Sequence, residues 1–185
     1  GTGLTTLDTA RVSRAGADQR RGRAGRTAPG VCIRLRNQGQ TAALAPFDTP
    51  EILAADLANL VLDLAAWGVS DPAALPFLDP PPGPAWAEAV ALLQRLEAID
   101  ASGHLTAQGK ALARLPLHPR LAHMVVAAAA EDDALAAAEL AVLIGERGLG
   151  GDGTDLSHRL DRFRRDSGKR ANDARQLAQR WAKLA

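Results

Sequence analysis

The sequence has few of the features that mark a secreted, disulfide-linked or membrane-spanning protein. Cys32 is the single cysteine among 185 residues, so no disulfide can form within the chain, as is usual in a reducing cytosol. No apolar run approaches the roughly 18–20 residues of a membrane span, and the first residues lack the apolar core of a signal peptide. We therefore expect a cytoplasmic protein that has no membrane partner.

Aromatic residues are also scarce, since they make up 3% of the chain and tyrosine is absent. Apolar residues nevertheless amount to 46%, with Ala and Leu doing most of the packing, which favours helices over sheets. The net charge of +1 does not mark the whole chain as a nucleic-acid binder. Basic residues gather in 11–36 and 159–183, however, whereas 48–63 and 131–139 are acidic. Such asymmetry is expected where separate segments bind anions.

The first quarter of the chain contains elements of an α/β sheet, but too few to form one. Residues 4–12 alternate loosely in hydrophobicity and predict a strand. Ser13 can cap a short helix over 14–25, and residues 31–36 predict a half-buried strand. Three such elements cannot bury a core by themselves. We interpret residues 1–45 as the end of a parallel α/β domain.

The middle of the chain has the element order of a winged helix. Thr49-Pro-Glu is a strong helix-start signal, and an apolar face follows it at helical spacing. The stiff connector DPPPGP precedes a second helix, expected over 84–99. A tight turn between two short strands comes next, and Thr106 can cap a further helix. We place this domain at residues 46–114.

The remaining segment, residues 115–185, has a helical pattern. Apolar residues recur at helical spacing and predict a small bundle of about four helices. The stretch GLGGDG (148–153) lacks the Lys and Ser/Thr that follow a phosphate-binding loop, so it is interpreted as a flexible linker. The expected fold is thus mainly α, with a remnant of an α/β domain, a winged-helix domain and a helical bundle.

The stretch QRRGRAGR (19–26) holds the strongest chemical signal. On a helix, Gln19, Arg23 and Arg26 stand at i, i+4 and i+7 and share one face. Guanidinium groups bind phosphate oxygens in a forked geometry. Gly22 and Gly25 each cost a helix roughly 1 kcal/mol relative to Ala, which is easier to understand if a partner approaches closely there. The alternative is a solvated arginine-rich helix end.

The same residues belong to a longer pattern. The run SRAGADQRRGRAGR (13–26) resembles motif VI of superfamily 2 helicases in its DEAH-box form. PGVCIRL (29–35) resembles the strand that follows this motif in those proteins. The resemblance continues through about residue 147, with TPEI, LTAQG and LPLHPRL in the winged-helix segment and with the variants AAWGV, PFLDPPP and LPLHPRLAHM, which are similar to bacterial HrpB-type helicases.

The resemblance implies specific roles in a site where two RecA-like domains enclose ATP with Mg²⁺. Arg23 and Arg26 would be arginine fingers that stabilise charge on the γ-phosphoryl group. Gln19 would orient the attacking water or contact the γ-phosphate, and Gly22 would belong to the same nucleotide-binding surface. Arg20 and Arg21 remain unassigned. The chain has neither a GxxxxGK[ST] phosphate loop nor an Asp-Glu-x-His box for Mg²⁺, so this fragment alone is expected to be inactive.

A basic run near the C-terminus is the candidate for contact with nucleic acid. Such side chains can follow the backbone of RNA or another single strand through phosphate contacts, although a solvated basic face remains the alternative. The expected helix 84–99 carries only Arg95 as a basic residue, which favours a packing role. No metal site is expected, because Cys32 and the four histidines lack ligand spacing. The candidate residues are Arg162, Arg165, Lys169 and Arg170, and the histidines are His104, His118, His123 and His158.

Two functions stay open at this point. The first is a fragment of an ATP-dependent RNA or DNA helicase, which supplies arginine fingers and helical domains and works with the RecA-like domains of the same protein. The second is a non-enzymatic nucleic-acid-binding module built on the winged helix and the basic bundle. They differ in whether ATP hydrolysis depends on Arg23 and Arg26.

Overall fold

The computed structural model describes residues 11–185, so most of the strand expected over 4–12 lies outside the described residues. The chain divides into two compact units, a smaller one that ends at Ala54 and a larger one from Ala55 to Ala185. The boundaries predicted after residues 45 and 114 stay predictions. Among the described residues, no helix is both long and apolar enough to cross a membrane.

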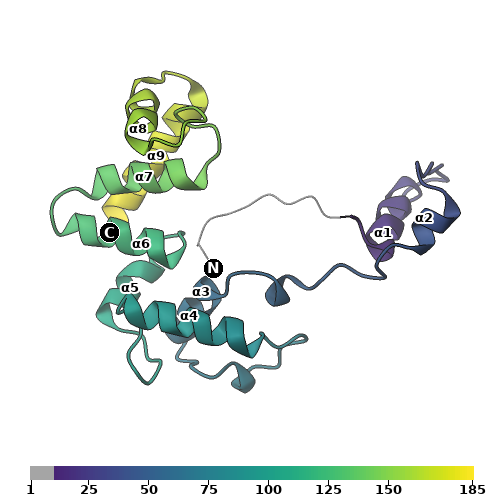
Figure 1. Cartoon of the computed structure of the whole chain (residues 1–185), viewed down its shortest axis with the longest axis horizontal. Helices are drawn as coiled ribbons and strands as arrows, with labels where there is room; N and C mark the ends of the chain where they lie inside the picture. The colour runs from purple at the N-terminus through teal and green to yellow at the C-terminus, as the bar shows by residue number, and fades with distance from the viewer. Residues whose placement is uncertain (1–10) are drawn as a thin grey trace. The chain divides into compact units, whose positions relative to one another are not determined.

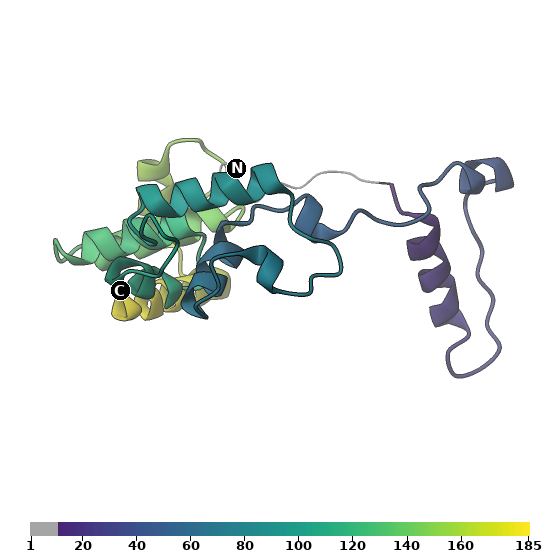
Figure 2. The same cartoon turned by 90° about the horizontal axis from the view of Figure 1, so that it is seen from below.

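The described part of the smaller unit contains the α-helices α1 (Arg14–Ala24) and α2 (Gln38–Ala42) (Figure 1). The predicted N-cap is confirmed, because the hydroxyl of buried Ser13 accepts a 2.9 Å hydrogen bond from the Gly16 N–H. The N–H of Arg14 donates to the Ala45 carbonyl at 2.8 Å, which ties the start of α1 to the chain that returns after α2. Figure 2 shows the segment between the two helices running back beside α1.

The strand predicted over residues 31–36 is wrong for this unit, since these residues carry no strand pairing. Val31, Ile33 and Leu35 are 87%, 81% and 97% exposed. A strand is stable only when a neighbouring strand takes up its backbone hydrogen bonds and another layer covers its apolar face. The described part of this unit offers neither a neighbouring strand nor a covering layer. The alternation of apolar and polar residues over 31–36 therefore does not lead to a strand.

The larger unit begins with α3 (Ala58–Ala66), α4 (Gly83–Arg95) and α5 (Ala107–Ala113). These helices pack around fully buried Leu93 and Leu112. The hairpin predicted between α4 and α5 is reduced to one antiparallel bridge, Ile99 with Leu105. The helix expected over 84–99 ends early because Glu97 adopts a φ of 55°, which no α-helix can continue.

The helix predicted to start at Thr49 starts nine residues later, at Ala58. Pro50 and Glu51 open only a short 3-10 turn, Glu51–Leu53, and Leu53 stays partly exposed. The start signal that prevails is Asp56, whose carboxylate accepts a 2.9 Å hydrogen bond from the Ala58 N–H. Side-chain oxygens that satisfy the first free N–H groups are what fixes a helix start.

The C-terminal helices form the predicted four-helix bundle: α6 (Pro119–Ala129), α7 (Ala134–Gly145), α8 (Leu156–Arg165) and α9 (Lys169–Leu184) (Figure 1). The helix α7 packs against each of the other three. Its core includes the fully buried Val125, Leu143 and Phe163. The described residues are therefore mainly α, as the composition predicted.

Asp56 lies between the start of α3 and the start of α6, and its ionisation makes the stability of the fold depend on pH. His118, the N-cap of α6, places its Nε2 3.5 Å from the Asp56 carboxylate. Partial burial of Asp56 opposes its ionisation, but the Ala58 N–H and His118 outweigh that effect, so the pKa of Asp56 lies below its ordinary value of 3.8. Because the pKa of Asp56 is lower in the folded than in the unfolded chain, Asp56 stabilises the fold when the pH is above its unfolded-state pKa. This contribution is lost as the pH falls through its folded-state pKa.

We expect the free energy of unfolding to decrease below about pH 4, and Asp56→Asn to remove part of that decrease. Chemical denaturation of both proteins between about pH 3 and pH 7 measures it. Only part is removed, because backbone N–H donors also lower the pKa values of Asp100 and Asp155. An identical pH dependence in Asp56→Asn would contradict this assignment.

Candidate functional site

The residues of the motif VI resemblance lie on and just beyond α1. Gln19 and Arg23 are exposed on the helix, one turn apart. The helix ends at Ala24, so Arg26 lies two residues past its end, and the prediction that all three side chains share one helical face is wrong for Arg26. The chain turns sharply here, and a Cβ on Gly30 would lie 1.9 Å from the Ala24 carbonyl oxygen. Only glycine permits that approach.

The two unassigned arginines face a different surface from Gln19 and Arg23. Arg20 and Arg21 line a cleft of about 330 Å³ between α1 and the extended segment, together with Cys32 and Arg34. Gln19 and Arg23 do not line it. The cleft thus separates Arg20 and Arg21 from Gln19 and Arg23, as helical spacing predicted for these four residues.

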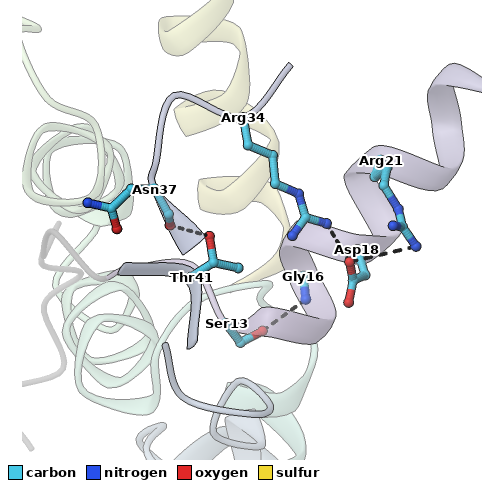
Figure 3. Close-up of polar contacts among 7 residues, drawn as sticks. All are labelled: Ser13, Gly16, Asp18, Arg21, Arg34, Asn37 and Thr41. Atoms are coloured by element: carbon cyan, nitrogen blue, oxygen red, sulfur yellow. Dashed lines mark hydrogen bonds and ion pairs between the residues drawn. The ribbon is translucent and has the colours of Figure 1, made fainter. Parts of the chain in front are cut away.

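Asp18 organises the cleft side of α1. Its carboxylate accepts a hydrogen bond from the Arg34 guanidinium and forms a longer ion pair, 3.9 Å, with Arg21 (Figure 3). The Arg34 hydrogen bond and the nearby cationic charges hold the pKa of Asp18 below its ordinary value. Arg34 and Arg21 are therefore engaged within the unit.

Gln19, Arg23 and Arg26 have no such partner among the described residues, and all three are exposed. Apart from its chain neighbours and the nearby backbone of α1, no atom of residues 11–185 lies within 4 Å of the position that a Cβ on Gly22 would occupy. Gln19 and Arg23 on α1, and Arg26 just beyond it, therefore present two guanidinium groups and an amide that are exposed. An exposed set of donors without carboxylate partners can bind an anion that approaches from outside this chain.

The basic residues of the bundle divide into structural and free groups, which the sequence did not separate. Arg164 donates at 2.7 Å to Glu139, a buried carboxylate on α7. Arg159 donates to the carbonyl oxygens of Leu143 and Leu149 at 2.9 and 3.2 Å. Buried carboxylates and carbonyls require such donors, so these arginines hold the bundle together.

Three of the four predicted nucleic-acid residues remain exposed and free of tertiary contacts with carboxylates. Arg165 and Lys169 pair only within their own helices, with Asp161 at 4.0 Å and Asp173 at 2.6 Å. The hydrogen bond to Asp173 raises the pKa of Lys169. Arg170 is different, because it donates at 2.6 Å to the Arg147 carbonyl and pairs with Glu146. The third free residue is Arg162, on α8.

No metal centre appears among the described residues, where no three His, Cys, Asp or Glu side chains gather closely enough to hold an ion. His104 and His158 each lie beside an aspartate, at 3.5 and 3.6 Å, and Cys32 is a free, exposed thiol. The two aspartates, Asp100 and Asp155, accept backbone N–H hydrogen bonds in a turn and at the start of α8.

Comparisons with known proteins place these features in context. Residues 89–117, which include the end of α4, the bridge and α5, match the winged-helix helicase associated domain HA2. The chain is 45% identical over 145 residues to the ATP-dependent RNA helicase HrpB of Escherichia coli, which covers 78% of this chain and 18% of HrpB. It is 43% identical over 115 residues to the probable ATP-dependent RNA helicase DHX34 of Mus musculus, which covers 62% of this chain and 10% of that protein.

The fold leads to the same relatives. The crystal structure of the Escherichia coli DEAH/RHA helicase HrpB superposes on 99% of this chain with a TM-score of 0.80 and 39% identity, over 22% of its own length. A second crystal structure, of the E. coli DExH-box NTPase HrpB, matches the whole chain with a TM-score of 0.73 and 36% identity, again over 22% of its length. This chain therefore spans less than a quarter of the proteins that it matches.

Proposed function

Because the chain corresponds in sequence and fold to a segment of the HrpB-type DEAH-box helicases, we propose that it is part of an ATP-dependent nucleic-acid helicase. The observation that carries this proposal is the motif VI-like run on and just beyond α1, whose Gln19, Arg23 and Arg26 side chains are exposed and unpaired within the described chain. The test is nucleic-acid-stimulated ATP hydrolysis by the full-length protein, which the double variant Arg23→Ala, Arg26→Ala should abolish.

In this proposal the chain supplies one side of a nucleotide site. Arg23 and Arg26 would donate to the equatorial oxygens of the γ-phosphoryl group, where negative charge must be stabilised during transfer. Gln19, one helical turn from Arg23, would hold the attacking water or the γ-phosphate. The opposite side of the site, with its phosphate loop, belongs to RecA-like domains outside this chain.

The α1 surface offers donors for phosphate oxygens, and within residues 11–185 no three His, Cys, Asp or Glu side chains gather closely enough to hold a metal ion. We therefore place the Mg²⁺ ligands in the RecA-like domains and expect the 185-residue chain alone to lack ATPase activity. We also propose a cytoplasmic location, which the unpaired thiol of Cys32 supports.

The bundle would guide single-stranded RNA or DNA through its free cations, Arg162, Arg165 and Lys169, whereas Arg170 is committed to the end of α7. A non-enzymatic nucleic-acid-binding module stays the second candidate, since the winged helix and the bundle occur in this chain without a phosphate loop. The module predicts salt-sensitive binding of single strands by the isolated chain; no binding at about 50 mM salt would contradict it.

The variant Gly22→Ala tests whether Gly22 belongs to the nucleotide-binding surface or affects only the stability of α1. In the isolated chain, Gly22→Ala should stabilise α1 by about 1 kcal/mol, because the added methyl group meets open space and alanine favours the helix. In the full-length protein the same change should lower ATP hydrolysis, since a nucleotide or domain approaches that surface. Helix content of the chain and hydrolysis by the full protein measure the two effects. Full activity of the variant would remove Gly22 from the nucleotide-binding surface.

A further inference from the structure

The stretch GLGGDG between α7 and α8, here named the glycine loop (residues 148–153), has a defined conformation rather than that of the predicted flexible linker (Figure 1). Gly148, Gly150 and Gly151 adopt φ angles of 75°, 67° and 91°, a region that other residues rarely occupy. Between them, Leu149 is buried in the bundle. The three glycines therefore shape the loop around one apolar anchor.

The packing of Arg159 fixes the glycine loop against α8. The Arg159 guanidinium donates to the Leu149 carbonyl through Nε at 3.3 Å and through a terminal nitrogen at 3.2 Å. A Cβ on Gly150 would lie 2.2 Å from the Arg159 carbonyl oxygen, so the loop backbone touches the helix backbone. The linker interpretation failed because composition alone does not show which neighbour requires the glycines.

The anchored loop contains backbone hydrogen-bond donors. Residues 147–150 lie in a turn, but within residues 11–185 the N–H groups of residues 148–151 make no close hydrogen bond to another backbone acceptor. Consecutive N–H groups in a glycine-rich turn with positive φ angles form a concavity that binds anions. The Arg162 guanidinium lies at the edge, 2.8 Å from the position of a Cβ on Gly151, and has no carboxylate partner among the described residues. A fixed loop, free N–H groups and a free cation therefore coincide.

Most of the charged side chains near the glycine loop already form other hydrogen bonds or ion pairs. Arg170 approaches Gly148 but is paired with Glu146. The Asp155 carboxylate accepts the N–H groups of Ser157 and His158 at 2.8 and 3.2 Å, so the start of α8 is already capped. Asp152 is an exposed carboxylate within the loop and opposes anion binding. Arg162 is thus the cation that can balance a bound anion.

We propose that the glycine loop and Arg162 form a binding site for a phosphate group. The ligand is either a phosphodiester of a single strand, in which case the site rests on the proposed function and gives the bundle a fixed point on the strand, or free phosphate. Arg162 donates from one side and the glycine N–H groups from the other, a geometry that suits the tetrahedral oxygens of phosphate.

The test follows the backbone amides of the ¹⁵N-labelled 185-residue chain during titration with inorganic phosphate and, separately, with a single-stranded oligouridylate. Saturable shifts of the amides of residues 148–151 are expected with the oligouridylate, with phosphate, or with both, and the pattern identifies the source. Arg162→Gln should weaken the binding that causes these shifts about tenfold, whereas Arg180→Gln, at an exposed arginine of α9 that is not among the proposed strand contacts, should preserve it. Asp152→Asn should strengthen it by removing a repelling charge.

The proposed phosphate site is wrong if neither compound shifts the resonances of these amides, or if Arg162→Gln leaves the affinity for the compound unchanged. The proposed helicase function fails independently, through hydrolysis that survives loss of Arg23 and Arg26 in the full-length protein. Retained loop shifts together with surviving hydrolysis would support the phosphate site and reject the arginine-finger assignment.

Discussion

Replacing Arg26 with alanine in the full-length protein is expected to lower nucleic-acid-stimulated ATP hydrolysis by about 10³-fold, which corresponds to about 4 kcal/mol of transition-state stabilisation. The guanidinium lies past the end of α1, exposed and without a carboxylate partner in the described chain. In the proposed site, its removal would take a positive charge from the γ-phosphoryl group without disturbing a contact within the described part of this unit. Steady-state hydrolysis with saturating single-stranded RNA measures the effect.

The matched control is Arg21→Ala, which removes the same side chain from the cleft face of α1. Arg21 forms only a long, exposed ion pair with Asp18, so its loss should change neither stability nor hydrolysis by much. Nucleotide binding should weaken far less than turnover in Arg26→Ala, because an arginine finger acts on charge that develops in the transition state. Equal losses in the Arg21 and Arg26 variants would reject the finger assignment.

Gly109→Ala is expected to destabilise the larger unit by about 3 kcal/mol, the upper range for overpacking in a tight core. A Cβ on Gly109 would lie 2.0 Å from the Ala98 carbonyl oxygen and 2.7 Å from Leu105. That carbonyl cannot withdraw, since it accepts hydrogen bonds from the N–H and hydroxyl of Thr106 at 3.0 and 3.1 Å. Chemical denaturation of the isolated chain, followed by helix content, measures the loss.

Gly145→Ala provides the control within the same unit. Gly145 is also helical, but apart from its chain neighbours and the nearby backbone of α7, no atom of the described chain lies within 4 Å of the position that an added methyl group would occupy. Alanine should therefore be neutral or slightly stabilising there. Should both variants lose stability equally, the cause would be general to helical glycines and the contact with Ala98 would be irrelevant.

Thr106 and Gly109 show how much of the fold could be predicted. The sequence predicted Thr106 as a helix cap, and its hydroxyl accepts the Gly109 N–H at 2.9 Å. Capping is a local interaction over three residues, so it can be found without the fold. The role of Gly109 depends on Ala98, eleven residues earlier, and only the packed structure brings the two backbones together.

The candidate site divides in the same way. Helical spacing alone separated Gln19 and Arg23 from Arg20 and Arg21, because the direction of a side chain on a helix follows from its position. The placement of Arg26 depends on where α1 ends, which the close approach of Gly30 to Ala24 decides. In the bundle, net charge could not distinguish the structural Arg159 from the free Arg162.

The sequence by itself therefore determined the helical class, the caps at Ser13 and Thr106 and the arginine-rich run of α1, all of which arise from interactions between residues close in the chain. Tertiary structure decided why residues 31–36 form no strand, which cations are free and why the glycine loop is fixed against α8. These outcomes depend on contacts between distant segments, whose energies no local pattern contains.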